Sequence, residues 1–89
     1  MTQHLLTIFN EIDFKLRMIA HFKKVHDRAA SDRGLRQLMI DQTIRQDDEI
    51  WNLVTNNKDL NRKVGRLERK YGLKEWFIFC DKAREVVNV

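Results

Sequence analysis

The chain has 89 residues, with 17 Lys and Arg against 13 Asp and Glu, three Gly, one Cys and no Pro. This length allows one domain, residues 1–89, whose small core would gain stability from a partner or a second copy. The single cysteine, Cys80, excludes a disulfide-linked secreted scaffold and favours a reducing compartment, so we expect a cytoplasmic protein. No apolar run approaches the ~20 residues of a membrane span, and the N-terminus lacks the features of a signal peptide, so we expect no membrane association.

Apolar residues recur at helical spacing along almost the whole chain, which predicts an all-α fold, a compact bundle of three to four helices. The first helix is expected over about residues 3–30. Its core face consists of Leu5, Phe9, Ile12, Leu16 and Ile19. A turn follows at residues 31–34, where Ser31 or Asp32 can cap the next helix. The second helix is expected from about Leu35 to Thr55. Its apolar face consists of Ile40, Ile44, Trp51 and Val54.

Two alternatives remain open at Asn56 and Asn57. The second helix can end here and a third can begin at Asp59, because Asn and Asp side chains compete for backbone hydrogen bonds. It can also continue, because an alternation of three and four residues runs through the segment. The residues of this seam are Ile50, Leu53, Asn57, Leu60, Val64, Leu67 and Tyr71. One long helix would form a coiled-coil-like dimer seam with Asn57 in its core, so Asn57 is a candidate interface residue.

Tyr71 and Gly72 predict a helix end, because Gly readily adopts the left-handed conformation found there. The last helix is expected from Leu73 to Val87. Its apolar face consists of Leu73, Trp76, Phe77, Cys80, Ala83 and Val87.

The sequence shows no pattern of an active site or a metal centre, so we expect no enzymatic activity, no metal and no cofactor. His21 and His26 lie about 140° apart on a helix, too far for the usual i, i+4 metal pair, and both are expected to be surface or half-buried residues. Cys80 is expected to pack as a small apolar residue. The acidic run at residues 47–49 is expected to be a solvated helix face, since successive side chains point 100° apart.

The strongest functional signal is the basic segment between Lys58 and Lys74. On a helix, most of its cations fall within an arc of about 80° or on its flank, while Leu60, Val64 and Leu67 face the opposite side. Such a strip suits nucleic-acid phosphates, since each neutralised phosphate releases counterions. Asn61 could add a contact to a base edge. The candidate nucleic-acid-binding residues are Lys58, Asn61, Arg62, Lys63, Arg66, Arg69 and Lys70.

The segment Arg69-Lys70-Tyr71-Gly72-Leu73 resembles the end of the recognition helix in Fis-type helix-turn-helix proteins, which commonly end in two basic residues, Tyr and Gly. The resemblance covers these five residues. Upstream, Leu67 and Glu68 depart from the apolar spacing of that family, and no tight turn is visible before Asn61. The resemblance favours DNA binding and does not identify a family.

The first helix carries a second apolar side, formed by Phe14, Met18 and Val25 with His21 between them. A helix that is apolar on two sides is either enclosed by the core or offers a surface to a partner. We therefore regard Phe14, Met18 and Val25 as candidate interface residues and expect a homodimer.

Together these observations predict a small non-enzymatic regulatory protein that binds nucleic acid through the basic face of residues 58–74. The alternative is a helical adaptor or inhibitor, comparable to small phage and plasmid regulators, that binds a protein target and no nucleic acid.

Overall fold

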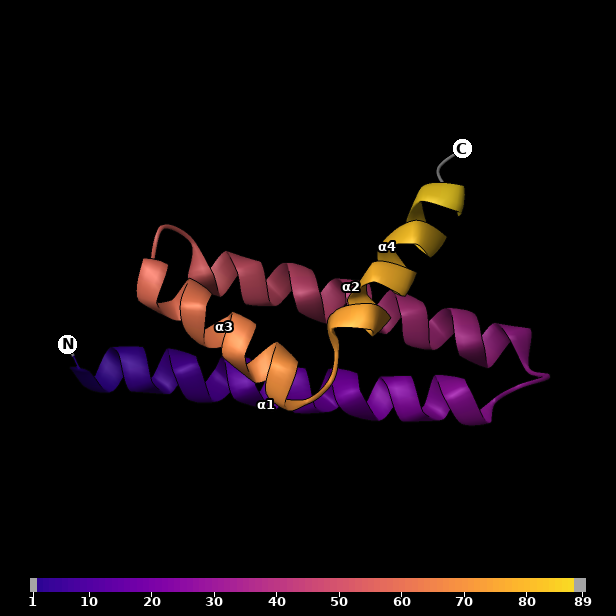
Figure 1. The fold of residues 1–89 in the computed structure, drawn as a ribbon, viewed down its shortest axis with the longest axis horizontal. Coiled ribbons are helices and arrows are strands. Elements are labelled where there is room, and N and C mark those ends of the chain that lie inside the picture. Colours follow the sequence, from indigo (N-terminus) through magenta and orange to yellow (C-terminus); the bar gives the residue numbers. More distant parts are fainter. Residues whose placement is uncertain (1, 88–89) are drawn as a thin grey trace.

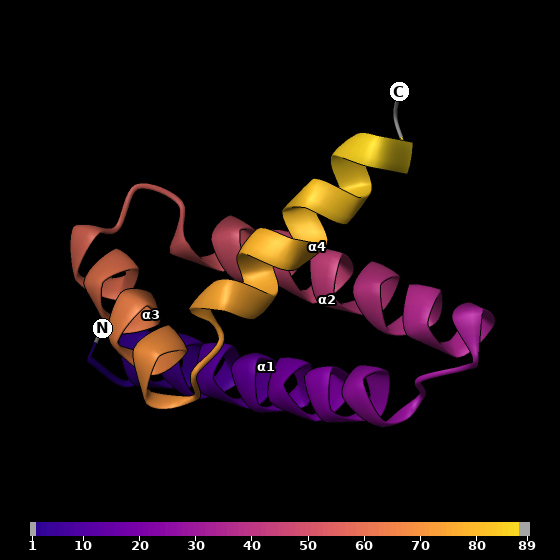
Figure 2. The same ribbon diagram turned by 45° about the vertical axis from the view of Figure 1, so that its right-hand side comes forward.

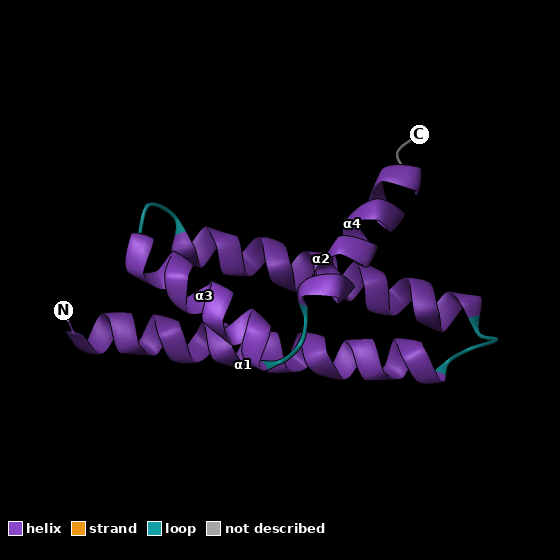
Figure 3. Cartoon of the chain, in the orientation of Figure 1, coloured by secondary structure: helices purple, strands orange, loops and turns teal. Residues whose placement is uncertain are grey.

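The computed structural model describes residues 2–87, and side-chain environments for residues 4–85. This part of the chain forms four helices joined by short turns, which confirms the all-α prediction: α1 (Thr2–Arg28), α2 (Arg33–Val54), α3 (Lys58–Lys70) and α4 (Lys74–Val87) (Figures 1 and 3). The molecule is elongated, with extents of 47 × 27 × 17 Å. None of the described helices is long and apolar enough to cross a bilayer.

The two long helices α1 and α2 form an antiparallel hairpin, as Figure 1 shows. The turn between them covers residues 29–32 and so only overlaps the turn predicted at residues 31–34, because Arg33 and Gly34 belong to the first turn of α2. Asp32 caps α2, and its carboxylate accepts a hydrogen bond from the Leu35 backbone N–H at 3.0 Å. This bond satisfies one of the free N–H groups at the start of α2, so the helix begins at Arg33.

The chain breaks between α2 and α3, so the continuous helix considered from the sequence does not form. Asn56 adopts a left-handed φ of 62°, and Asn57 caps α3 by accepting from the Leu60 N–H at 3.0 Å. Asn tolerates the left-handed conformation better than most residues and is among the best N-caps. Because the dimer seam required one long helix, the placement of Asn57 in its core is wrong.

Tyr71 and Gly72 end α3 as predicted. Gly72 adopts a left-handed φ of 65°. The Tyr71 and Gly72 N–H groups donate to the carbonyls of Leu67 and Arg69, and the Leu73 N–H donates to Glu68. This turn redirects the chain, so that α3 lies beside the N-terminal half of α1 while α4 crosses α2 and extends away from the hairpin (Figure 2).

The core lies between α1, α2 and α3 and continues under the first turns of α4. Its buried members are Ile12, Leu16, Ile19, Ile40, Ile50, Val54, Leu60, Val64, Leu67, Leu73, Trp76 and Cys80. The predicted face of α2 is only partly correct, because Ile50 is fully buried whereas Trp51 is 43% exposed. Trp76 holds α4 in place, since its indole N–H donates to the Thr43 hydroxyl at 3.1 Å.

The cap at Asn57 gives a test of the helix break. Replacing Asn57 by Leu removes the side-chain acceptor of the Leu60 N–H, so we expect a loss of ~1 kcal/mol in the free energy of unfolding. For a domain of this size the melting temperature should fall by about 4–8 °C. The control Asn10→Ala, at an exposed position within α1, should change the stability by less than ~0.5 kcal/mol. Stabilisation by Asn57→Leu would instead indicate the continuous helix.

Candidate nucleic-acid interface

Helix α3 separates its apolar and its basic residues onto opposite faces. Leu60, Val64 and Leu67 are 3%, 1% and 8% exposed and fix the helix to the core. The other face carries the basic strip, whose members are all exposed: Lys58, Arg62, Lys63, Arg66, Arg69 and Lys70. Asn61 is exposed as well. The helical geometry predicted for the candidate residues is therefore present in the structure.

The basic strip is largely free of internal ion pairs. Among the described side chains, the only ion pair of the strip joins Arg62 to Asp59 at 3.5 Å, and both side chains remain more than 70% exposed. Lys63 lies over the Phe9 ring of α1, with Nζ 5.2 Å from the ring centre. Such exposed contacts are weak, so these cations can exchange them for an anionic ligand.

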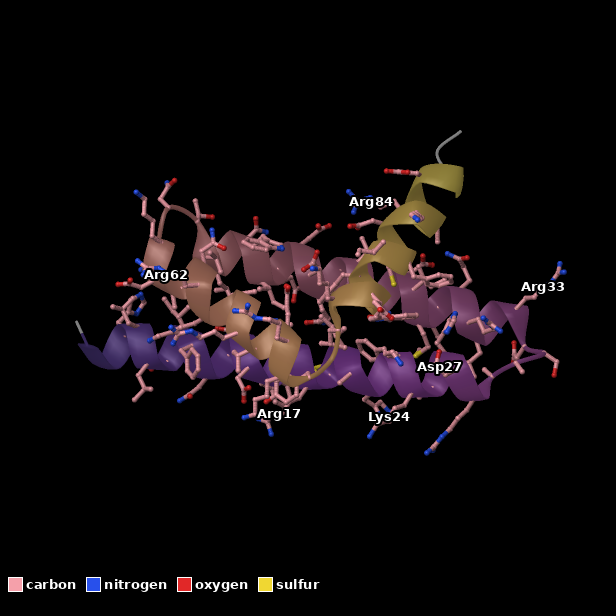
Figure 4. All side chains as sticks on the ribbon, viewed as in Figure 1. Arg17, Lys24, Asp27, Arg33, Arg62 and Arg84 are labelled. Carbon is pink, nitrogen blue, oxygen red and sulfur yellow. The ribbon has the colours of Figure 1, made fainter. Side chains whose placement is uncertain are left out.

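A shallow hollow of about 230 Å³ follows the strip and is lined by Asp59, Arg62, Lys63 and Arg66. Figure 4 shows Arg62 at one end of the bundle and Arg33 at the other. Since α3 has 13 residues, the strip extends over about 20 Å along the helix axis.

The C-terminal end of α3 is anchored to α1 by a polar contact. The Tyr71 hydroxyl donates a hydrogen bond to the Asp13 carboxylate, which also pairs with Arg17 at 3.3 Å. The hydrogen bond to Asp13 raises the pKa of Tyr71 above its usual value. Helix α3 is thus held by its apolar face and by its C-terminal end. These two contacts fix the direction in which the cations of the basic strip project.

Acidic side chains of α2, α3 and α4 lie near one another away from the basic strip, namely Asp47, Glu68 and Asp81. Burial raises the pKa of Asp47 to about 6, and the Asp81 carboxylate adds to this effect. Burial, together with the charge of Asp47, also raises the pKa of Glu68. The prediction of a solvated acidic face is therefore correct for Asp48 and Glu49, which are exposed, and wrong for Asp47.

The raised pKa of Asp47 predicts a pH-dependent effect of Asp47→Asn. Between pH 3.8, the ordinary pKa of the carboxyl in the unfolded chain, and pH about 6, its pKa in the folded protein, Asp47 binds more protons in the folded state than in the unfolded state. The free energy of unfolding of the wild type therefore falls as the pH rises through this window. The neighbouring charges are Asp48, Asp81, Glu68 and Arg84. Because Asp47 is only partly buried, we expect the variant to be more stable by ~1 kcal/mol at pH ~8 and almost unchanged at pH ~4. Thermal unfolding at both pH values measures this, and an equal shift at both would contradict it.

His26 and Cys80 are both buried in the structure. The expectation of a surface or half-buried histidine is correct for His21, which is exposed, and wrong for His26, which is 4% exposed and packs 4.7 Å from the Trp76 ring. Burial raises the pKa of the Cys80 thiol to about 12, which disfavours the nucleophilic thiolate. Within the described residues, no three His, Cys, Asp or Glu side chains are grouped to hold a metal ion.

The second apolar side of α1 faces away from the other helices. Phe14 is 56% exposed, while Met18 and Val25 are partly exposed. Figure 4 shows Arg17 and Lys24 pointing outward from the same helix. A hollow of about 280 Å³ in this surface is lined by Phe14, Arg17, Met18, His21 and Phe22.

One feature beside the basic strip was missed from the sequence. The turn between α2 and α3 leaves Trp51 exposed at the edge of a hollow of about 320 Å³. Its lining residues are Trp51, Val54, Thr55, Asn56, Asn57, Lys58 and Asn61. The signal available in the sequence was the group of Asn residues after Trp51, but the apolar spacing assigned Trp51 to the core face.

Comparisons with protein-family models, curated proteins and solved structures give no match. The Fis-type resemblance of residues 69–73 is therefore not extended by any of them. The structure does place a tight connection before α3, formed by Thr55, Asn56 and Asn57, at the helix break that was one of the two alternatives open from the sequence.

Proposed function

We propose that the protein is a non-enzymatic regulatory protein that binds nucleic acid through the basic strip of α3. The observation that carries this proposal is the exposure of six cations along one side of a helix whose opposite side is buried. A fixed helix loses little conformational freedom on binding, and its cations meet few internal acids. The lone thiol, Cys80, suits a reducing compartment such as the cytoplasm.

The strip favours contacts to phosphates over contacts to bases. Arg and Lys bind phosphate oxygens in any sequence, and these contacts position a protein along the backbone. A strip of about 20 Å runs alongside several successive phosphates of one strand, which are about 3.4 Å apart along the duplex axis. We therefore propose binding that depends weakly on sequence and strongly on salt.

Titration of a labelled random-sequence duplex at ~50 and ~150 mM salt, followed by fluorescence anisotropy, tests the proposal. Three to six phosphate contacts predict a slope of log affinity against log salt between about −3 and −5. If no affinity is found at either salt concentration and a protein target is recovered by pull-down, the adaptor alternative replaces this proposal.

A second surface supports self-association, and we propose that the partner of α1 is another copy of this chain. The hollow on α1 is lined by residues at i, i+3, i+4 and i+7, namely Phe14, Arg17, Met18 and His21. This is the four-residue hole that receives one side chain of a facing helix in coiled-coil packing. The hole therefore fits a helical partner.

The charges along α1 favour an antiparallel pair. Glu11 lies near the start of the outward side, whereas the imidazole of His21 and the cation of Arg28 lie towards its end. A parallel pair would place each Glu11 carboxylate against its own copy. An antiparallel pair places it beside the His21 imidazole of the second copy, whose ring N–H can donate to it, when Phe14 enters the facing hole. A dimer would also present two basic strips to one nucleic acid and so increase the overall affinity.

A further inference from the structure

The hollow beside Trp51 has the chemistry of a nucleobase site. Trp51, a residue that is 43% exposed and whose side chain is hydrogen-bonded to Asp47, contributes an indole ring. Asn56 and Asn61 are exposed and contribute carboxamides. Aromatic rings stack on the faces of unpaired bases, and carboxamides pair with base edges as both donor and acceptor. A volume of about 320 Å³ lies at the lower end of the range for ligand pockets.

The fold explains why this ring is exposed. Trp51 lies in the last turn of α2, and the left-handed Asn56 is followed by Asn57, the N-cap of α3. The chain therefore reverses beside the ring without covering it. Thr55 is engaged by its own helix, since its hydroxyl donates to the Asn52 carbonyl at 2.9 Å. The carboxamide oxygen of Asn57 caps α3 by accepting a hydrogen bond from the Leu60 N–H. The side chains of Asn56 and Asn61, which also line the hollow, take part in neither of these two hydrogen bonds.

The hollow is continuous with the basic strip. Lys58 and Asn61 line the hollow and also belong to the candidate interface, and Arg62 and Lys63 line the next hollow along α3. A strand whose phosphates follow the strip can therefore turn one base into the hollow. Stacked and paired bases of an intact duplex do not expose a face to an indole, whereas a single strand does.

We propose that Trp51 stacks on an unpaired base of a single-stranded nucleic acid whose phosphates bind the basic strip. This inference rests on the proposed nucleic-acid binding and specifies its ligand as a single strand. The strip supplies affinity for the backbone, and the hollow adds affinity for a base.

Three labelled probes of equal length test the inference: an oligothymidine strand, an abasic strand with the same phosphodiester backbone, and a duplex. We expect the wild type to bind oligothymidine more tightly than the abasic strand by about 5- to 150-fold, the range for stacking one base. Trp51→Leu should lose this preference and keep its affinity for the abasic strand and the duplex. Trp51→Phe, which retains an aromatic ring, should keep most of the preference.

Tryptophan emission gives a second readout. Trp51 is exposed and Trp76 is 4% exposed, so a bound base should quench the emission of the wild type but not that of Trp51→Leu. Circular dichroism checks that the variant is folded. If oligothymidine binds the wild type and Trp51→Leu equally, the stacking inference is wrong while binding by the strip stands. If none of the three probes binds, the proposed function itself is wrong.

Discussion

The double variant Arg62→Glu/Arg66→Glu is expected to lose about 30-fold or more in duplex affinity at ~150 mM salt. Each lost phosphate contact reduces the slope of log affinity against log salt by about 0.9. At ~150 mM salt the loss of two contacts corresponds to a decrease in affinity of about 30-fold, and repulsion between the new carboxylates and the phosphates adds to it. Both side chains project from the exposed side of α3, so the fold should change little. Anisotropy titrations at several salt concentrations measure both the affinity and the slope.

A matched control separates the position of the charges from their number. Arg33→Glu/Lys82→Glu makes the same change in net charge at exposed sites on α2 and α4, and Arg33 lies at the opposite end of the bundle from Arg62 (Figure 4). We expect this control to bind almost as well as the wild type. If both double variants lose the same affinity, binding follows the net charge and the basic strip is not the site.

Local patterns were sufficient to predict the fold class and the two helix ends with strong capping residues. Asp32 begins α2 by accepting a hydrogen bond from the Leu35 N–H, and Gly72 ends α3 through its left-handed backbone conformation. Both effects involve only residues close together in the sequence, so the sequence pattern is enough to predict them. The break at Asn56 was different, because a continuous and a broken helix both satisfied the local pattern. Breaking there lets Leu60 and Val64 pack against α1, a contact between residues distant in sequence.

In the candidate site, too, some features follow from the local sequence and others depend on residues distant in sequence. The exposure of the basic strip followed from helical spacing, since Leu60 and Val64 specify which face is buried. The exposure of Trp51 did not follow, because it depends on where the chain turns back from α2 into α3, which then packs against α1. An apolar side chain at the end of a helix lies in the core or at an edge according to its neighbours in space, and spacing alone cannot distinguish these places.

The variant Phe14→Glu/Met18→Glu is expected to convert a dimer into a monomer. In the proposed antiparallel pair, Phe14 enters the hole of the facing helix beside Met18, so four carboxylates would meet at the centre of the interface. Burying them without partners is unfavourable by several kcal/mol, which exceeds what the rest of a one-helix interface can offset. Sedimentation equilibrium at high micromolar concentration measures the change. A wild type that is monomeric under these conditions would exclude this interface, and a heterologous protein would then be the remaining partner for α1.

Two further variants test the specificity and the direction of the pairing. Leu6 is 57% exposed on α1 but lies about 90° around the helix from the Phe14 side, so Leu6→Glu should leave the dimer intact. Glu11→Arg should weaken an antiparallel dimer, because it removes the carboxylate that accepts from the His21 ring N–H of the second copy. Adding His21→Glu should restore the association, because the new carboxylate then faces the new guanidinium. In a parallel dimer these two positions would not face each other, so the second substitution would give no recovery. The recovery therefore reports the antiparallel direction itself, independently of how strongly the apolar side chains contribute.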